Sequence, residues 1–300
     1  MRVCALADPL LLSTQAEVDE LAELGCEVLQ GTLQIAGPEL TSLAGLETLR
    51  RIEGTLSVSG TASLENLVGL DSLESIEATL TIQGSSGLLS LGGLESLTWL
   101  GGDLIVNGCE SLVDVSALQG TRFGAGNMYV TSDPALEDFT GLEHLTERQN
   151  VTIASNAALS SLDGLDALEK VTALLISTND ALPSLVLPAL KGVESLSITS
   201  HTVLEEIRFP ALERCEDSVM IAGNPALLTV DLESLASAVS LSITGNAELV
   251  SIGTLASLTE VQMMTIAGNP NLAQCEVDAI DARLGACSPC TDNDDLASCE

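Results

Sequence analysis

The sequence has few aromatic residues, few basic residues and no long apolar segment. One Trp, one Tyr and three Phe make up its aromatic content over 300 residues, although 46% of the residues are hydrophobic. The core must therefore be aliphatic, built from similar small side chains used many times. Such a core suits a repeat protein, in which each unit packs only on its neighbours and no single large core is needed.

Positive charge is scarce. Ten Lys and Arg residues stand against 43 Asp and Glu residues, so the formal net charge is −33 at pH 7. Nucleic acid binding needs a basic surface for the phosphates and is therefore not expected. The same charge argues against anionic membrane surfaces. It is typical of a soluble protein outside the cytoplasm, or of one that meets cations or basic partners.

Segments that would cross a membrane or direct export are also missing. No apolar run approaches the roughly 18 residues that a membrane-spanning helix needs. Asp8 and Pro9 interrupt the first residues before the apolar core of a signal peptide could form. Eight cysteines nevertheless gather mainly near the two ends of the sequence, which favours an oxidising compartment. We expect a secreted or cell-surface protein whose export signal lies upstream of this start or has been removed.

One short motif recurs along the sequence. A strand-like stretch ends in Ile or Val, and two small residues, a turn residue and a Leu follow, as in residues 243–249. All ten intervals between successive anchors measure 22 to 24 residues, a period that indicates a solenoid. The eleven anchors are Ile35, Val58, Ile82, Val106, Val130, Ile153, Ile176, Ile198, Ile221, Ile243 and Ile266.

Leucines within each repeat follow a second spacing, of three residues. Glycine and aspartate interrupt these series, as in residues 91–94 and 162–165, and a long α-helix tolerates such residues poorly. We expect instead short segments joined by tight bends, with one Leu of each segment pointing inward. Asparagine recurs at the turn after the strand, where it can satisfy the backbone of the adjacent coil; the positions are Asn156, Asn179, Asn224, Asn246 and Asn269.

The repeat predicts a right-handed leucine-rich β-solenoid, mainly β with parallel sheets, of about eleven coils and with a short capping helix at each end. Handedness follows the general rule for parallel crossovers. The capping box that begins at Thr14 and the glycines Gly25 and Gly285 mark the helix ends. We expect one domain over residues 1–300, with a helical cap at 1–26, the solenoid at 27–272 and a disulfide-stapled cap at 273–300.

The sequence resembles the receptor L domain of insulin-receptor and epidermal-growth-factor-receptor ectodomains. The likeness is clearest in residues 25–35, preceded by Cys4 and a short helix. The sequence also looks like bacterial and fungal cell-surface repeat proteins, through residues 187–190 and 209–212. The resemblance implies the solenoid fold over the whole chain and a disulfide between Cys4 and Cys26. Eleven repeats exceed those of one receptor L domain, so hormone binding is not carried over.

The four cysteines near the C-terminus allow three interpretations. They could ligate zinc, and residues 287–290 have a Cys-x-x-Cys spacing that also occurs in redox sites. Two disulfides that staple the cap are the plainer interpretation, given the extracellular inference. The expected pairs are Cys275 with Cys287 and Cys290 with Cys299. Of the remaining cysteines, Cys109 is expected to be unpaired at a turn, and Cys215 to be a buried thiol.

Acidic residues recur in a Gly-Leu-acid-x-Leu motif and would stack one coil apart. Stacked carboxylates repel one another, and the plain interpretation is a solvated acidic edge that aids solubility. The alternative hypothesis is a face for divalent cations or a basic partner. Its candidate residues are Glu47, Asp71, Glu95, Glu143 and Asp166.

Ser and Thr dominate the outward positions of the strands. Flat hydroxyl ladders can bind ice, carbohydrate or mineral, but bulky side chains interrupt this one. Aromatic and apolar interruptions are typical anchors for protein binding. The binding-surface candidates are Trp99, Ile105, Tyr129, Leu175 and Met220.

Catalytic motifs are not apparent, and no cofactor is expected. The two histidines, His144 and His201, fall at different positions of different repeats. We therefore expect a non-catalytic extracellular or cell-surface binding or scaffold module that recognises a protein or a glycan through exposed strand faces. The first alternative is a structural or ice-binding rod. A polysaccharide-active β-helix enzyme ranks lower, since it needs long loops and converging basic residues, and this chain has two lysines and uniform repeats.

Overall fold

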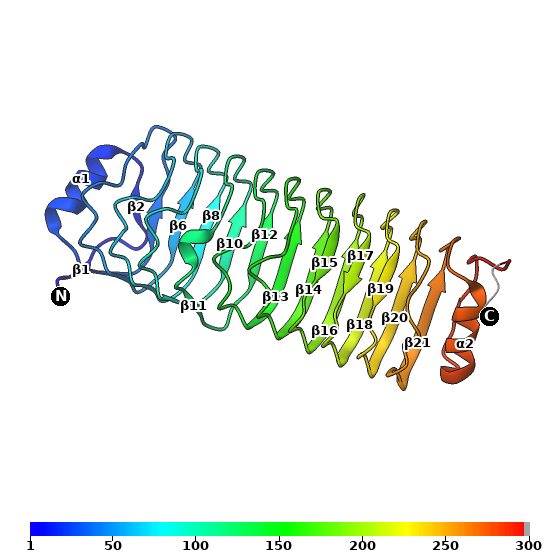
Figure 1. Ribbon diagram of the computed structural model, residues 1–300. Helices are drawn as coiled ribbons and strands as arrows, with labels where there is room; N and C mark the ends of the chain where they lie inside the picture. The colour runs from blue at the N-terminus through cyan, green and yellow to red at the C-terminus, as the bar shows by residue number, and fades with distance from the viewer. Residues whose placement is uncertain (297–300) are drawn as a thin grey trace. The chain divides into compact units, whose positions relative to one another are not determined.

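The computed structural model describes residues 1–296 and contains two compact units (Figure 1). The first unit comprises residues 1–149 together with 163–165. The second comprises residues 150–162 and the described chain from 166 onward. Each unit is a stack of parallel-strand coils, and strand β13 (Glu147–Ala154) contains the boundary between them. That the chain behaves as one domain stays a prediction.

The first unit contains two parallel sheets. One follows the order β1–β3–β5–β7–β9–β11, and the other contains β2–β4–β6–β8–β10–β12. The bounds are β1 Val3–Ala5, β2 Leu10–Leu12, β3 Val28–Gln30, β4 Leu33–Ile35, β5 Arg51–Ile52, β6 Leu56–Ser59, β7 Ser75–Ile76, β8 Leu80–Gln83, β9 Trp99–Leu100, β10 Leu104–Asn107, β11 Arg122–Phe123 and β12 Met128–Thr131, with a 3₁₀ turn η1 at Ser116–Leu118.

The second unit repeats this plan with longer strands. Its main sheet contains β14–β16–β18–β20–β21, and a smaller sheet contains β15–β17–β19. The bounds are β14 Lys170–Ser177, β15 Ser184–Val186, β16 Gly192–Thr199, β17 Glu206–Arg208, β18 Arg214–Ala222, β19 Thr229–Asp231, β20 Ser237–Thr244 and β21 Glu260–Ala267. In Figure 1 these strands follow one another in the order of the repeats.

The predicted β-solenoid is confirmed, with about twelve coils rather than eleven. Equivalent repeat positions pair with one another, so that Val58 lies in register with Ile82 and Ile82 with Val106. The additional coil begins at β2, where Leu12 pairs with Ile35. Leu12 has no strand-turn-Leu motif after it, because the helix α1 follows directly. The right-handed sense of the coils stays a prediction.

The three-residue spacing of the leucines arises from consecutive tight turns. The N–H of Leu70 donates to the carbonyl of Leu67 at 3.0 Å, and the N–H of Leu73 donates to that of Leu70 at 2.8 Å. All three side chains are fully buried, each contributing roughly 1.5–3 kcal/mol of hydrophobic stabilisation. Between them Gly69 has a φ of +116°, and a Cβ there would lie 2.2 Å from the carbonyl oxygen of Leu43. Only glycine fits that approach.

Helices are present where the sequence predicts them. Helix α1 (Gln15–Leu24) begins with a capping box, in which Thr14 accepts from the N–H of Glu17 and the Glu17 carboxylate accepts from the N–H of Thr14. It ends at Gly25 in the left-handed conformation. Helix α2 (Gln274–Leu284) ends in the same way at Gly285. The role of both helices as caps stays a prediction.

A column of buried polar residues, here called the polar ladder, runs through the second unit three residues after each anchor. The side-chain oxygen of Asn246 accepts from the N–H of Asn224 at 3.0 Å, and its Nδ2 donates to the carbonyl of Ile221 at 3.2 Å. Each asparagine thus satisfies two backbone groups of the preceding coil. The members are Asn156, Asn179, His201, Asn224, Asn246, Asn269 and Asn293.

Different residues occupy the ladder position in the first unit. They are Thr61, Ser85, Cys109 and Asp133, all fully buried. Asp133 accepts from the N–H of Cys109 at 2.8 Å through Oδ1, as an asparagine oxygen would. Burial raises the pKa of Asp133 to about 6, against hydrogen bonds from Cys109 and Thr131 that lower it. A carboxyl group is therefore held where the other unit uses amides.

We expect Asn246→Ala to destabilise the protein by roughly 2–5 kcal/mol, because it leaves the Asn224 N–H and the Ile221 carbonyl buried without these partners. Asn271→Ala is the matched control, since its side chain is exposed and donates to the Glu248 carboxylate rather than to a buried backbone group. Urea unfolding and amide hydrogen exchange measure both variants. Equal losses in the two variants would contradict a structural role for the ladder.

Asp133→Asn should stabilise the protein at pH 7.5 by an amount on the order of 2 kcal/mol. The folded pKa of Asp133 lies near 6, above its ordinary value of 3.8. Its contribution to stability is therefore full below about pH 4 and is lost as pH rises through about 6. The advantage of the amide should accordingly shrink toward pH 4.

Thermal unfolding across this pH range measures the effect of Asp133→Asn. Asp19→Asn is the control for net charge, since Asp19 is exposed on α1. A gain at pH 7.5 that is the same for both variants would assign the effect to net charge and not to the buried carboxyl.

Candidate functional site

Four of the five predicted binding-surface residues lie on strands of the 12-stranded sheet, and Trp99 lies on the six-stranded sheet. Trp99 lies on β9 and is 38% exposed. Ile105 on β10 and Tyr129 on β12 are register partners and half-buried, on the other sheet of the first unit. Leu175 on β14 and Met220 on β18 lie in the second unit, with 38% and 41% of their surfaces exposed. Trp99 therefore does not share a sheet with the other four residues, and a binding role for all five stays a prediction.

The outward positions of β14, β16, β18, β20 and β21 form a surface called here the strand face. One row places Leu175, Ser197, Met220, Ser242 and Thr265 in register. The neighbouring row ends at Met263, which is 54% exposed. The intervening residues Leu174 and Ile176 are buried, so the predicted alternation is confirmed. The strand face therefore combines rows of hydroxyl side chains with isolated apolar ones, and its strands also expose charged side chains near their N-terminal ends, among them Glu194 and Glu216.

The acidic motif has a local role. The Asp71 carboxylate accepts from the N–H of Gly69 at 2.7 Å, and the Glu95 carboxylate accepts from the N–H of Gly93 at 2.8 Å. Glu47 and Glu143 make the same bond to Gly45 and Gly141, whereas Asp166 makes no such bond within residues 1–296, although all five side chains are exposed. These carboxylates hold the turns before them, and binding of divalent cations stays a prediction.

The cysteine pairing is partly as expected. Cys4 and Cys26 form the disulfide that the receptor L domain resemblance implies, with Cα atoms 5.8 Å apart. At the other end both expected pairings, Cys275 with Cys287 and Cys290 with Cys299, are wrong, because Cys287 pairs with Cys290. Their Cα atoms are 5.6 Å apart, since the short turn between them reverses the chain locally. Cys275 is also in a disulfide, and Cys299 lies outside the described residues.

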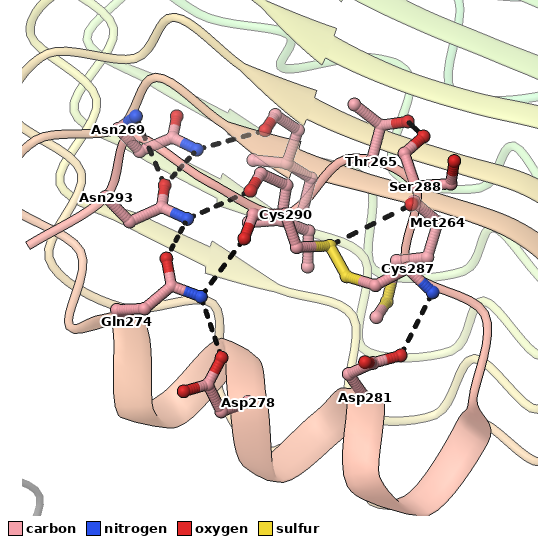
Figure 2. The surroundings of a disulfide bond; sticks show 12 residues. Met264, Thr265, Asn269, Gln274, Asp278, Asp281, Cys287, Ser288, Cys290 and Asn293 are labelled. Carbon is pink, nitrogen blue, oxygen red and sulfur yellow. Dashed lines mark hydrogen bonds between the residues drawn. A yellow bond between two sulfur atoms is a disulfide. The ribbon is translucent and has the colours of Figure 1, made fainter. Parts of the chain in front are cut away.

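Residues after α2 continue the coil pattern against β21, as Figure 2 shows. The N–H of Ser288 donates to the carbonyl of Met264, and the N–H of Met264 donates to that of Ala286. Asn293 extends the polar ladder, accepting from the N–H of Asn269 and donating to Gln274. The Cys287–Cys290 disulfide lies within this segment.

Two buried basic residues were not foreseen. His201 is a ladder member whose N–H donates to the Asn224 oxygen, and burial lowers the pKa of its ring. Arg148 lies five residues before its anchor, where Val171 and Val193 stand in later coils. It is 5% exposed, and burial lowers its pKa to about 10 against the opposing charge of Asp103. Counting positions from the anchors would have identified both.

Two kinds of feature are absent from residues 1–296. No group of three or more His, Cys, Asp or Glu side chains there is placed to hold a metal ion. None of the helices among these residues is long and apolar enough to cross a membrane.

Comparison with known proteins agrees with this geometry. Residues 25–97 match the family model of the Receptor L domain. The chain is a receptor-L-domain-like β-solenoid. The matched segment lies within the first unit and ends before Trp99. Receptor L domains are a family of ligand-binding domains and not of enzymes, so the match indicates binding in general terms. None of the curated proteins compared with the sequence matches it.

The thiols of Cys109 and Cys215 should be unreactive in the native L-domain-like solenoid. Both are free and buried, and burial raises the pKa of each to about 11. Because the thiolate is the reactive form, labelling at pH 8 should be slow until the protein is unfolded. Unfolding without reductant should then expose these two thiols, as mass spectrometry can map. If mass spectrometry instead found label on Cys287 or Cys290 together with bound zinc, these cysteines would form a metal site and not a disulfide.

Proposed function

We propose that the protein is a non-catalytic binding or scaffold module of the extracellular space or cell surface, which recognises a protein or a glycan through the strand face. The observation that carries this proposal is the exposure of Leu175, Met220 and Met263 on that face. The two rows in which these residues lie otherwise carry mainly Ser and Thr.

The geometry of the strand face favours binding of a broad partner. Parallel strands in register place equivalent side chains about 4.8 Å apart, so the surface is flat and its backbone is already paired. Short Ser and Thr side chains lose little conformational entropy when a partner covers them. Met side chains are flexible and polarisable, and they adapt to an apolar partner surface.

The compartment is inferred from the cysteines and from the family. The disulfides Cys4–Cys26 and Cys287–Cys290 persist in oxidising environments such as the cell exterior. Receptor L domains act as ligand-binding modules of receptors, which agrees with an exposed position. The net charge of −33 favours basic or neutral partners and leaves divalent cations as candidate ligands of the acidic turns.

Met220→Arg should weaken binding to any ligand of the strand face by about tenfold or more, because it places a long charged side chain among the apolar anchors. The ligand is sought on arrays of glycans and of secreted proteins. Val250→Arg is the matched control, since Val250 is an exposed apolar residue outside the strands.

A ligand that binds wild type and Val250→Arg alike but loses affinity for Met220→Arg supports the proposal. A ligand whose affinity is equal for all three proteins would place binding elsewhere. Turnover of any arrayed polysaccharide would favour the enzyme alternative.

A further inference from the structure

Aromatic residues concentrate in one part of the first unit. Four of the five in the sequence, Trp99, Phe123, Tyr129 and Phe139, fall between residues 99 and 139. Phe139 is fully buried and belongs to the core, whereas Trp99 is 38% exposed. An exposed Trp in a protein with an otherwise aliphatic core is an unusual use of that side chain. Trp and Arg are the residues most enriched in binding hot spots.

Trp99 has an arginine as its neighbour. It pairs in register with Ser75 on one side and with Arg122 on the other, and Ser75 pairs in turn with Arg51. Equivalent positions of parallel strands point to the same side of the sheet. Trp99 and Arg122 are both exposed, so they lie side by side on the outer surface of β9 and β11.

The two arginines of this row differ in their ion pairing. Arg51 contacts the Glu77 carboxylate at 3.2 Å and that of Glu53 at 4.0 Å. Both acids lie two residues after a member of the row, so they stand beside it on the same surface. The corresponding positions after Trp99 and Arg122 are Gly101 and Gly124. Arg122 makes no ion pair with any of the residues that the structure describes.

Gly101 and Gly124 leave a strip of backbone without side chains, here called the glycine shelf, beside the Trp99 and Arg122 side chains. A Cβ at Gly101 would lie 2.2 Å from the carbonyl oxygen of Glu77, and one at Gly124 would lie 2.5 Å from that of Gly101. Successive coils therefore approach so closely that no side chain fits there. An approaching group can reach Arg122 over this backbone without displacing a carboxylate of the protein itself.

The buried side chain of Arg148 supports the backbone of the glycine shelf. Its Nη1 donates to the carbonyls of Gly102 at 3.0 Å and Gly124 at 3.3 Å, and its guanidinium lies 5.0 Å from the centre of the Phe123 ring. Its Nε and Nη2 are buried and have no hydrogen-bond partner. Burying a guanidinium with some of its N–H groups unpaired costs folding free energy. Proteins carry such a cost where a backbone must be held in place for function.

We infer that Trp99, Arg122 and the glycine shelf between them form a docking site for a protein segment that presents an Asp or Glu carboxylate beside an apolar side chain. The carboxylate pairs with Arg122, and the apolar side chain packs on Trp99. Because the chain carries a net charge of −33, a strongly acidic partner is repelled at long range, so the carboxylate must stand on a neutral or basic partner. This site rests on the proposed binding function and locates a contact outside the strand face.

Peptide selection on the whole protein tests the site. Two phage libraries of short random peptides without Trp are used, one containing Asp and Glu and the other lacking both. Trp99 is the one Trp in the sequence, so its fluorescence reports binding at the site. Peptides from the acid-containing library should alter Trp99 emission, and added salt should weaken them.

Arg122→Ala should weaken the selected peptides by about tenfold or more, whereas Arg51→Ala, the ion-paired member of the same row, should change affinity by less than about twofold. Circular dichroism checks that both variants are folded, as expected for exposed side chains.

Four outcomes would overturn the site. They are equal binders from the acid-free library, no binder from the acid-containing one, no response of Trp99, and no effect of Arg122→Ala. A response of Trp99 to oligogalacturonate but to no peptide would replace the protein partner by an acidic glycan. Peptides that lose affinity for Met220→Arg while leaving Trp99 emission unchanged would preserve the strand-face function and reject this site. If the selected peptides neither altered Trp99 emission nor lost affinity for Met220→Arg, both this site and the strand-face function would be rejected.

Discussion

The structure depends on the need of each coil to satisfy the buried backbone of the coil before it. The strands do this by parallel pairing, but the turn after each strand has no regular partner. Asn246 shows the solution: one amide accepts from the backbone of Asn224 and donates to that of Ile221. An unsatisfied backbone group of this kind costs about 1–3 kcal/mol, so the ladder position tolerates few residue types.

The same close stacking governs the outer surfaces. Because the inward positions are filled by aliphatic side chains and the turns by glycine and asparagine, the outward strand positions are free to vary. In the second unit they carry Ser and Thr with Leu175 and Met220 among them, a surface that is flat and already paired in its backbone. Variation confined to outward positions is how a solenoid changes its ligand without changing its fold.

Departures from the repeat are informative for this reason. Asp133 stands in the ladder, and Arg148 stands in a column that later coils fill with Val, Cys or Ala, although both positions are buried. Neither improves the packing of its own coil. Arg148 instead holds the glycine backbone beside Trp99 and Arg122. In an L-domain-like solenoid of nearly uniform coils, a binding contact is best sought where the uniformity is interrupted.

The sequence by itself determined the period, the anchors, the inward leucines, both ends of α1 and the C-terminal end of α2. These follow from contacts within one repeat or from chain-local rules, as the capping box at Thr14 and the turn at Gly25 illustrate. The tertiary structure alone decided the pairing of Cys287 with Cys290, the use of Asp71 to hold its own turn, and the lack of an ion pair between Arg122 and any other residue of 1–296. These depend on which of several near partners the folded chain brings within reach. Where such a contact joins one coil to the next, as at Arg122, the two residues lie 22 to 24 positions apart in the sequence. Register and close approach decide which residues meet, and neither can be read from composition or periodicity.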